Sequence, residues 1–498
     1  MQIFVRTDKP EAFADEALVF SYTEEAVEQL KKGKPGDAVG TLAHEAVAPG
    51  DFKGTNGQLL VLPSPGVVNA QRLVLLGLGK EKELSTEKIR RAYNAIAKKA
   101  RELKLKSFAV VYPDGTGGLP DYDLAVSIVE GVVLGAYKFD KYLTEEKEKN
   151  GLHHFTILTS SGKAQNLGAF AHQAITVCDN VNYARDLVSD STYVVNPVTL
   201  VEEAKQLAKK HGLKCTVHDA KDLKKMGMGL MVAVGQGSKY PPHLIVLEYT
   251  GNKSIKEKIA LVGKGVTFDS GGLNLKPTNY IETMRGDMAG VAAVLGTMKT
   301  LAELKIKRNV VAVLPCVENM IGPEAYKPGD VFKAYNGKTV EISNTDAEGR
   351  LILADALAFT AKEVKPTAII DLATLTGSCL ATFGEFVSGL LSNNPEITKR
   401  LFDAGQKTFE RVWELPLYEE YKEEMKGDIS DLKNIGYKGG KYAGAITAAA
   451  FLEKFVGETP WAHLDIAGSA WYETGKHYTP KNGTGFGVRL LTRFFMDL

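Results

Sequence analysis

The sequence predicts an α/β protein with two parts: a smaller N-terminal α/β domain, and a larger C-terminal domain whose mostly parallel central sheet is flanked by helices. Strand-like and helix-like segments alternate through the second part, as they do in parallel sheets with crossover helices. Several strands are short, continuous apolar runs, which is typical of strands covered on both faces. The chain of 498 residues also exceeds an average domain of about 150 residues, so more than one domain is expected.

The smaller domain is predicted from three strands and one long helix. Gln58–Pro63 and Gln71–Leu76 have the composition of strands, and Ser107–Tyr112 has that of a buried strand. Helical periodicity predicts a helix over Glu83–Leu103, with Ser85 placed to cap its N-terminus.

A connecting helix is predicted next, because Gly168–Val188 carries small and apolar residues at helical spacing. The charged run Glu145–Asn150 has poor apolar periodicity and is interpreted as a solvated surface segment. We therefore expect an N-terminal domain over residues 1–165, a connecting helix over 166–190 and a second domain over 191–498.

The second domain is expected to alternate strands with helices. Strands are predicted at Leu213–His218, His243–Glu248, Lys258–Val262, Asn309–Val317, Ala368–Ala373 and Ala462–Ala467. Helices are predicted at Leu200–His211, Ala289–Leu304, Arg350–Lys362 and Tyr442–Phe455. Ligands of such sheets bind beyond the carboxyl ends of the strands, so polar residues that follow strands are candidates for a functional site.

The bulk composition argues against several classes of protein. Lys and Arg total 61 and Asp and Glu total 60, a balance that indicates no large basic surface for nucleic acid or an anionic membrane. The four cysteines form no C-x-x-C pair, and so few cysteines fit a reducing compartment. The N-terminal segment lacks the apolar core of a signal peptide, and the longest apolar runs have strand length. A cytoplasmic protein without a membrane partner is expected.

Charged residues gather in two glycine-rich stretches that follow predicted strands. The first stretch and its continuation supply Lys264, Asp269, Lys276 and Asp287, and the second supplies Asp346, Glu348 and Arg350. Taken alone, either stretch is explained as well by a structural turn or helix cap as by a functional site. Together they would bring four carboxylates to one place, where they repel unless cations neutralise them. Two divalent ions, bridged by carboxylates, are the simplest solution.

The second stretch has a spacing suited to this role. Asp346 and Glu348 are two positions apart, so an extended loop places both side chains on one side. Arg350 lies at the start of the predicted helix, where free backbone N–H groups and the helix dipole favour negative charge. A small anion is expected there.

At these residues the sequence resembles the leucyl aminopeptidase (cytosol aminopeptidase) family of two-metal metallopeptidases. Asn344–Leu351 matches the signature octapeptide of that family, and Val262–Pro277 closely matches its other metal-binding segment. The likeness covers most of residues 180–498 and includes Asp371–Gly377, Tyr442–Val456 and His463–Gly468. The N-terminal part is only loosely recognisable.

The resemblance implies two divalent metal ions in a catalytic metallopeptidase domain. One ion would be held by Lys264, Asp269, Asp287 and Glu348, and the other by Asp269, Asp346 and Glu348, with help from the Asp346 main-chain carbonyl. A neighbouring cation lowers the pKa of a lysine, which lets its neutral amine act as a ligand. Such a donor set would accept Zn or Mn, and Mg or Co would also fit.

The implied activity is release of N-terminal amino acids from peptides with a free N-terminus, by attack of a water or hydroxide shared by the ions. Lys276 would stabilise the oxyanion, Arg350 would hold a bicarbonate ion as general base, and Asp287 would bind the α-amine of the substrate. The pocket for a Leu-type or Met-type side chain would be lined or bordered by Met284, Asn344, Ala347, Thr374 and Leu375. The family also implies a homohexamer with active sites facing an interior cavity.

Three alternatives remain open: a DNA-binding or regulatory role, an inactive scaffold, and another two-metal hydrolase such as a phosphoesterase. The near-neutral net charge weighs against DNA binding, and the complete set of ligand residues weighs against an inactive scaffold. Phosphoesterase sites are usually rich in histidine, and neither motif contains one. The sequence has no H-E-x-x-H or G-x-S-x-G motif, and His463 is interpreted as a core residue. Ser189 and Ser191 replace an asparagine and a proline that are common in the family.

Overall fold

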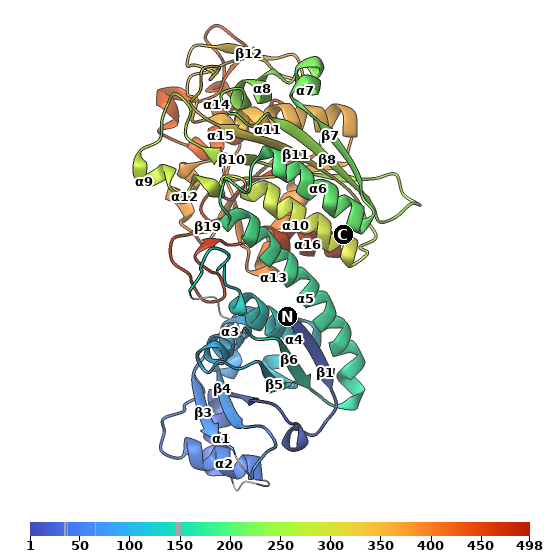
Figure 1. The fold of residues 1–498 in the computed structure, drawn as a ribbon, viewed down its shortest axis with the longest axis vertical. Coiled ribbons are helices and arrows are strands. Elements are labelled where there is room, and N and C mark those ends of the chain that lie inside the picture. The colour runs from blue at the N-terminus through green and yellow to red at the C-terminus, as the bar shows by residue number, and fades with distance from the viewer. Residues whose placement is uncertain (34–35, 37, 65, 146–150) are drawn as a thin grey trace. The chain divides into compact units, whose positions relative to one another are not determined.

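The computed structural model describes residues 1–33, 36, 38–64, 66–145 and 151–498, so most of the charged run Glu145–Asn150 lies outside the described residues. The chain divides into two compact units (Figure 1). The first comprises Met1–Asp179 with Gly475–Pro480, and the second comprises Asn180–Thr474 with Lys481–Leu498. The division falls within helix α5 (Ser161–Ser189), which covers nearly all of the predicted connecting helix. The predicted domain limits themselves stay a prediction.

The first unit is built on a six-stranded sheet in the order β1-β6-β5-β2-β4-β3. The strands are β1 (Gln2–Arg6), β2 (Leu18–Thr23), β3 (Leu59–Pro63), β4 (Arg72–Gly79), β5 (Ser107–Val111) and β6 (His154–Leu158). All neighbours are parallel except β3 and β4. The three predicted strands of this unit are confirmed as β3, β4 and β5.

The helices of the first unit include α1 (Glu24–Lys32), α2 (Ala38–Val47), α3 (Thr86–Glu102) and α4 (Asp121–Ala136). Apolar residues of α1 and α2 share one core with β2 and β4, while α3 packs against α4 and β4. Ser85 caps α3 as predicted, because its Oγ accepts a hydrogen bond from the Lys88 main-chain N at 3.3 Å.

The second unit contains a nine-stranded sheet in the order β16-β15-β18-β14-β9-β11-β8-β7, with β10 also paired to β11. The strands are β7 (Lys214–His218), β8 (His243–Thr250), β9 (Ile259–Gly263), β10 (Gly265–Asp269), β11 (Asn309–Asn319), β14 (Ala368–Ala373), β15 (Ser388–Ser392), β16 (Val412–Glu414) and β18 (Trp461–Asp465). The central strands β18, β14, β9 and β11 are parallel, and antiparallel pairs lie toward the edges. All six strands predicted here are present.

Helices cover both faces of this sheet (Figure 1). In Figure 1, α8 (Gly229–Gly235), α11 (Glu348–Phe359) and α15 (Gly444–Glu453) lie on one face and share a hydrophobic core with the strands. The other face is covered by α6 (Pro197–His211), α10 (Ala289–Glu303), α13 (Pro395–Thr408) and α16 (Val488–Asp497). Shorter helices are α7 (Ala220–Met226), α9 (Thr278–Ile281), α12 (Gly377–Phe383) and α14 (Glu419–Glu423). The predicted fold class, a two-part α/β protein with a mostly parallel larger sheet, is confirmed.

Two small sheets were not predicted. One joins β12 (Val331–Lys333), β13 (Thr339–Glu341) and β17 (Leu432–Lys433), and the other pairs β19 (Trp471–Tyr472) with β20 (Asn482–Gly483). Strands of two or three residues are too short to show a period in the sequence. Among the described residues, no helix combines the length and apolar character that crossing a membrane would require.

The unusual serines near residue 190 have local structural roles. Ser189, the last residue of α5, accepts a hydrogen bond at Oγ from the Gly483 main-chain N at 3.2 Å. The Ser191 Oγ accepts one from the Tyr193 main-chain N at 3.3 Å, which closes a tight turn. Both serines thus hold backbone around the end of α5.

Candidate active site

The candidate site lies where β9, β10 and β14 end and α11 begins. Lys264 directly follows β9, Asp269 ends β10, and Glu348 opens α11. The predicted helix start at Arg350 was two residues late, so Glu348 and Arg350 both lie in the first turn of α11. Gly349 packs closely against Lys264: a Cβ at this position would lie 2.4 Å from Lys264 Cε, so the lysine side chain would have to shift.

Lys264 is deeply buried between two of the predicted ligands. Its Nζ lies 2.6 Å from Asp287 Oδ1 and 3.0 Å from Glu348 Oε1. It also donates to the main-chain oxygen of Thr374 at 2.7 Å, and the Thr374 hydroxyl donates to Asp287 Oδ1 at 2.7 Å. The loop after β14 therefore fixes both the lysine and one of its carboxylate partners.

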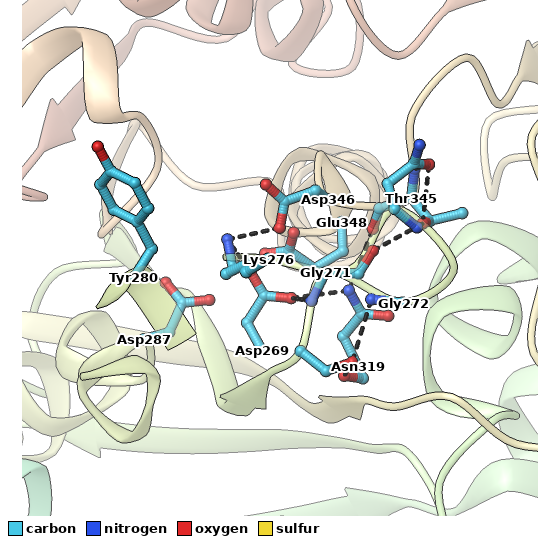
Figure 2. Close-up of polar contacts among 12 residues, drawn as sticks. Asp269, Gly271, Gly272, Lys276, Tyr280, Asp287, Asn319, Thr345, Asp346 and Glu348 are labelled. Atoms are coloured by element: carbon cyan, nitrogen blue, oxygen red, sulfur yellow. Dashed lines mark hydrogen bonds and ion pairs between the residues drawn. The ribbon is translucent and has the colours of Figure 1, made fainter. Parts of the chain in front are cut away.

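Lys276 bridges the other two carboxylates of the cluster (Figure 2). Its Nζ lies 2.8 Å from Asp269 Oδ2 and 2.5 Å from Asp346 Oδ1. The side chain of Lys276 is 14% exposed, compared with 3% for Lys264. Of the two lysines, Lys276 is therefore the one that a bound molecule could reach more easily.

Hydrogen bonds tie the two motif loops together (Figure 2). Asp269 Oδ1 accepts from the Gly271 main-chain N at 2.9 Å and from Asn319 Nδ2 at 2.8 Å. Asn319 Nδ2 also donates to the Thr345 main-chain oxygen at 3.1 Å, and the Thr345 hydroxyl donates to the Gly271 main-chain oxygen at 2.7 Å. The loop after β10 and the loop before α11 are thus held in register.

Asn319 and Thr345 were not among the predicted site residues: Asn319 lies two residues beyond the predicted strand Asn309–Val317, and Thr345 was given no role of its own. Asn319 ends β11, which is paired in parallel with β9 and β10, so the strand-end rule could have selected it. Thr345 lies inside the second motif, but its contacts with the first motif depend on how the two loops meet. Tyr280, on α9, is largely exposed.

The electrostatics of the cluster indicate a missing positive charge. Burial, reinforced by the charge of Glu348, raises the pKa of Asp269 well above its usual range. Burial raises the pKa of Asp287 to about 7 despite the opposing charge of Lys264, and burial and Glu348 also raise the pKa of Asp346. Although burial opposes the shift, Lys264 and Lys276 lower the pKa of Glu348, so the two amines favour its charged form but do not fully offset the other three carboxylates.

The donor atoms fit divalent cations. Asp269, Asp346 and Glu348 can each offer an oxygen such that these atoms lie within 4.8 Å of one another. Asp287 Oδ2 is buried and has no hydrogen-bond partner within the described part of the chain. Carboxylates whose pKa values are raised by burial and by mutual repulsion are stabilised by a bound cation, which supplies the charge that is lacking.

Arg350 is a separate feature of the site. It is buried, and its Nη1 donates to the Asn434 main-chain oxygen at 3.0 Å. Its Nε has no hydrogen-bond partner among the residues described. Burial lowers the pKa of Arg350 to about 10, although Glu348 and Asp465 oppose this shift. A buried guanidinium with an unsatisfied donor suits a small anion.

The predicted substrate-binding residues lie beside these groups. Met284 opens a short 3-10 helix whose C-terminal cap is Asp287, and the Asp287 main-chain N donates to Met284 O at 3.3 Å. Asn344 Oδ1 accepts from the Asp346 main-chain N at 2.8 Å, and Ala347 is buried in the same loop. Leu375 follows Thr374, and its main-chain N donates to Asp465 Oδ1 at 3.2 Å. Their role in binding a substrate side chain stays a prediction.

His463 is buried in the sheet, as expected of a core residue. Its Nδ1 lies 2.6 Å from Asp371 Oδ1 on the neighbouring strand, and both side chains are fully buried. Trp461 Nε1 donates to the other oxygen of Asp371 at 2.7 Å. This pair and its tryptophan belong to the interior between β14 and β18.

Comparison with known proteins places this site in a family. Residues 182–492 match the model described as the cytosol aminopeptidase family, catalytic domain, and residues 18–146 match its N-terminal domain. The chain belongs to the cytosol aminopeptidase family. It is therefore a peptide hydrolase, and its family is that of metal-dependent aminopeptidases.

Relatives within the cytosol aminopeptidase family match nearly the whole chain. A probable cytosol aminopeptidase from Geobacter sp. (strain M21) is 43% identical over 498 residues and covers 99% of both chains. One from Geotalea uraniireducens (strain Rf4) is 44% identical over 453 residues, covering 90% of each. Among solved structures, the bottromycin maturation enzyme BotP in complex with Mn is similar, with a TM-score of 0.85 and 29% identity. That match covers 97% of this chain and 99% of BotP.

Proposed function

We propose that this chain is an aminopeptidase that releases N-terminal amino acids, preferably of the Leu or Met type, from peptides with a free α-amine. The observation that carries the proposal is the cluster of four carboxylates, three of them buried, around two lysines and next to the buried Arg350. We assign Lys264, Asp269, Asp287, Asp346 and Glu348 as ligands of two divalent ions.

The two ions, when bound, would activate a water and polarise the peptide carbonyl. Zn and Mn are the first candidates, and Mg and Co also suit an oxygen-rich site. BotP is a structural neighbour described with Mn, which supports testing this ion.

The protein side chains supply the rest of the chemistry. Asp287 binds the α-amine of the substrate, which restricts cleavage to the first residue. Lys276, the more exposed of the two lysines, donates to the carbonyl oxygen as negative charge develops on it. Arg350 holds bicarbonate, which we assign as the general base, through its unsatisfied guanidinium nitrogen.

The pocket for the N-terminal side chain is proposed from its neighbours in the site. Met284 and Thr374 adjoin Asp287, the residue that receives the α-amine. Asn344, Ala347 and Leu375 adjoin the ligand loop and the loop after β14. An apolar pocket distinguishes side chains by only about 1–3 kcal/mol per methylene, so preference and not strict selection is expected.

Location and assembly form part of the same proposal. The relatives are named cytosol aminopeptidases, which supports a cytoplasmic enzyme. A homohexamer follows from the family resemblance, and sedimentation analysis of the purified protein would test it.

The decisive assay uses leucine p-nitroanilide before and after chelation, with Mn²⁺ or Zn²⁺ then restored and the N-acetylated substrate as control. Activity that requires both metal and a free α-amine is expected. Cleavage of the acetylated substrate, or full activity after complete removal of metal, would contradict the proposal. Inactivity with every metal would instead favour the scaffold or DNA-binding alternatives.

A further inference from the structure

The loop that carries Asp346 and runs into Glu348 is held by a side chain from a distant part of the sequence. Asn434 is fully buried, and its Nδ2 donates to the Asn344 main-chain oxygen, 90 residues earlier, at 2.6 Å. The same nitrogen lies 3.4 Å from the Ala347 main-chain oxygen. Asn434 Oδ1 accepts from the main-chain N of Ser343 at 2.8 Å and of Asn344 at 3.3 Å.

One amide group thus engages both ends of this loop. A primary amide offers two donors and two acceptor positions, and the four contacts of Asn434 match this capacity. Because Asp346 lies between the two ends and Glu348 directly follows them, the amide limits the movement of both carboxylates.

Asn434 also reaches Arg350 through its own backbone. The Asn434 main-chain oxygen accepts from Arg350 Nη1 at 3.0 Å. The position of one residue is therefore coupled to the carboxylates of the cluster and to the guanidinium beside them.

The small sheet β12-β13-β17 delivers Asn434 to this place. Asn434 follows β17, which runs parallel to β13, and its main-chain N donates to the Glu341 main-chain oxygen at 3.2 Å. The segment before β17 is fastened to β13 as well. The Glu341 carboxylate accepts from the main-chain N of Asp428 at 2.9 Å and of Ile429 at 3.0 Å. The support of the loop is therefore itself well anchored.

We infer that Asn434 is a positioning residue that holds the loop of Asp346 and Glu348, together with Arg350, in the geometry needed for metal binding and catalysis. The inference rests on the proposed function, because it takes these two carboxylates as metal ligands. Removing a partner that orients metal ligands typically lowers metal affinity or activity by about 10- to 100-fold.

Two substitutions test this role. Asn434→Ala removes all four contacts and leaves loop N–H and C=O groups unpaired. Asn434→Asp keeps the size and the acceptor, but places an oxygen against the main-chain oxygens of Asn344 and Ala347. Both variants should weaken metal binding.

A matched control is Asn309→Ala, because Asn309 holds another loop in the same way. Its Oδ1 accepts from the Asn252 main-chain N at 3.0 Å, and its Nδ2 donates to the Ile255 main-chain oxygen at 3.0 Å. Asn309 begins β11, whereas Asn319, which contacts Asp269, ends it. At about 3.3 Å per residue, these ends are about 33 Å apart.

The test is calorimetric titration of metal-free protein with Mn²⁺, accompanied by thermal unfolding in chelator and by kcat and KM at saturating Mn²⁺. Both Asn434 variants should bind Mn²⁺ at least tenfold more weakly than wild type. Their kcat should fall by a larger factor than their KM changes. Asn309→Ala should also lower stability, because it removes the same kind of contact, and should leave Mn²⁺ binding unchanged.

Wild-type affinity in both Asn434 variants would overturn the inference, as would equal weakening by the Asn309 variant. A wild-type protein that binds Mn²⁺ without cleaving peptides would contradict the proposed function, while the titrations would still decide the role of Asn434.

Discussion

Lys264 and Asp287 form an ion pair inside the candidate site, with Nζ 2.6 Å from Oδ1 and both side chains almost completely buried. The same amine lies 3.0 Å from Glu348, so one cation serves two carboxylates. Burial and Glu348 both raise the pKa of Asp287, which shows that the lysine alone does not satisfy the acidic groups. This ion pair should therefore contribute to the stability of the metal-free protein, which can be measured without an activity assay.

Lys264→Met should destabilise the metal-free protein strongly, because it removes the charge that Asp287 and Glu348 share. Loss of one partner of a buried ion pair costs about 3–5 kcal/mol. Thermal unfolding in chelator would measure the loss, and added Mn²⁺ should recover part of it. The control is Lys399→Met, since Lys399 and Asp403 form an exposed pair that contributes about 0–1 kcal/mol. Equal stability of the Lys264 variant and wild type would be incompatible with this account.

Arg350→Ala should lower kcat by roughly 100- to 10,000-fold, the usual range for loss of general base catalysis, without removing metal. The guanidinium donates to Asn434, and as a cation it cannot act as a metal ligand. Elemental analysis of the purified variant, alongside steady-state kinetics, checks both parts. Arg350→Lys keeps the charge but loses the planar fork, and should recover only part of the activity. Metal loss from the alanine variant would count against the assigned role.

Gly271→Ala should weaken metal binding by tenfold or more. Gly271 has φ of 85°, and a Cβ there would lie 2.4 Å from the Asn274 main-chain oxygen and 2.9 Å from Asp346 Oδ1. Gly329→Ala is the control, because Gly329 has φ of 94° but open space around the added Cβ. Both changes introduce backbone strain of roughly 1–2 kcal/mol, which thermal unfolding would report. Metal titration should distinguish the two variants, because only the Gly271 variant places a Cβ against the ligand loop. Similar metal affinities of the two variants would refute this account.

Stability should depend on pH through Asp355, a buried carboxyl group on α11 that accepts from the main-chain N of Met231 and of Tyr335. Burial raises its pKa to about 7, against the opposing effect of these hydrogen bonds. Between about pH 4 and 7 the folded protein holds this proton and the unfolded chain has released it. The contribution of Asp355 to the free energy of unfolding therefore falls as pH rises through this window, by on the order of 4 kcal/mol, and levels off above it.

Denaturant unfolding of wild type and Asp355→Asn at several pH values would isolate this contribution. The asparagine does not titrate, so the difference between the two proteins should change between pH 4 and 7 and stay constant above pH 8. A difference independent of pH would show that Asp355 is ionised in the folded protein throughout.

Local patterns in the sequence were sufficient for the main elements of the larger unit. β9, β11 and β14 are continuous apolar runs, and their burial on both faces is what such runs indicate. The helix α10 was predicted almost to its ends, because its small and apolar residues recur with helical spacing. These features are visible in one segment at a time, without knowledge of the rest of the chain.

The details of the site were harder to predict because they join segments that are far apart in sequence. Asn319 and Asp269 are separated by 50 residues, and Asn434 and Asn344 by 90. The short strand β13 pairs with both β12 and β17, and strands of two or three residues have no recognisable pattern in the sequence. Gly475–Pro480 likewise belongs to the first unit although it lies near the C-terminus, a relationship that no local pattern in the sequence indicates.

The sequence by itself determined the fold class, the positions of the principal strands along the chain, and the two charged loops that identify the family, because each depends on residue types at short spacing. Only the tertiary structure decided that Lys264 serves both Asp287 and Glu348, and that Asn434 holds the loop of Asp346 and also contacts Arg350. Buried polar groups must each find a partner, and the chain supplies those partners from whichever segment the packing of the sheet brings near.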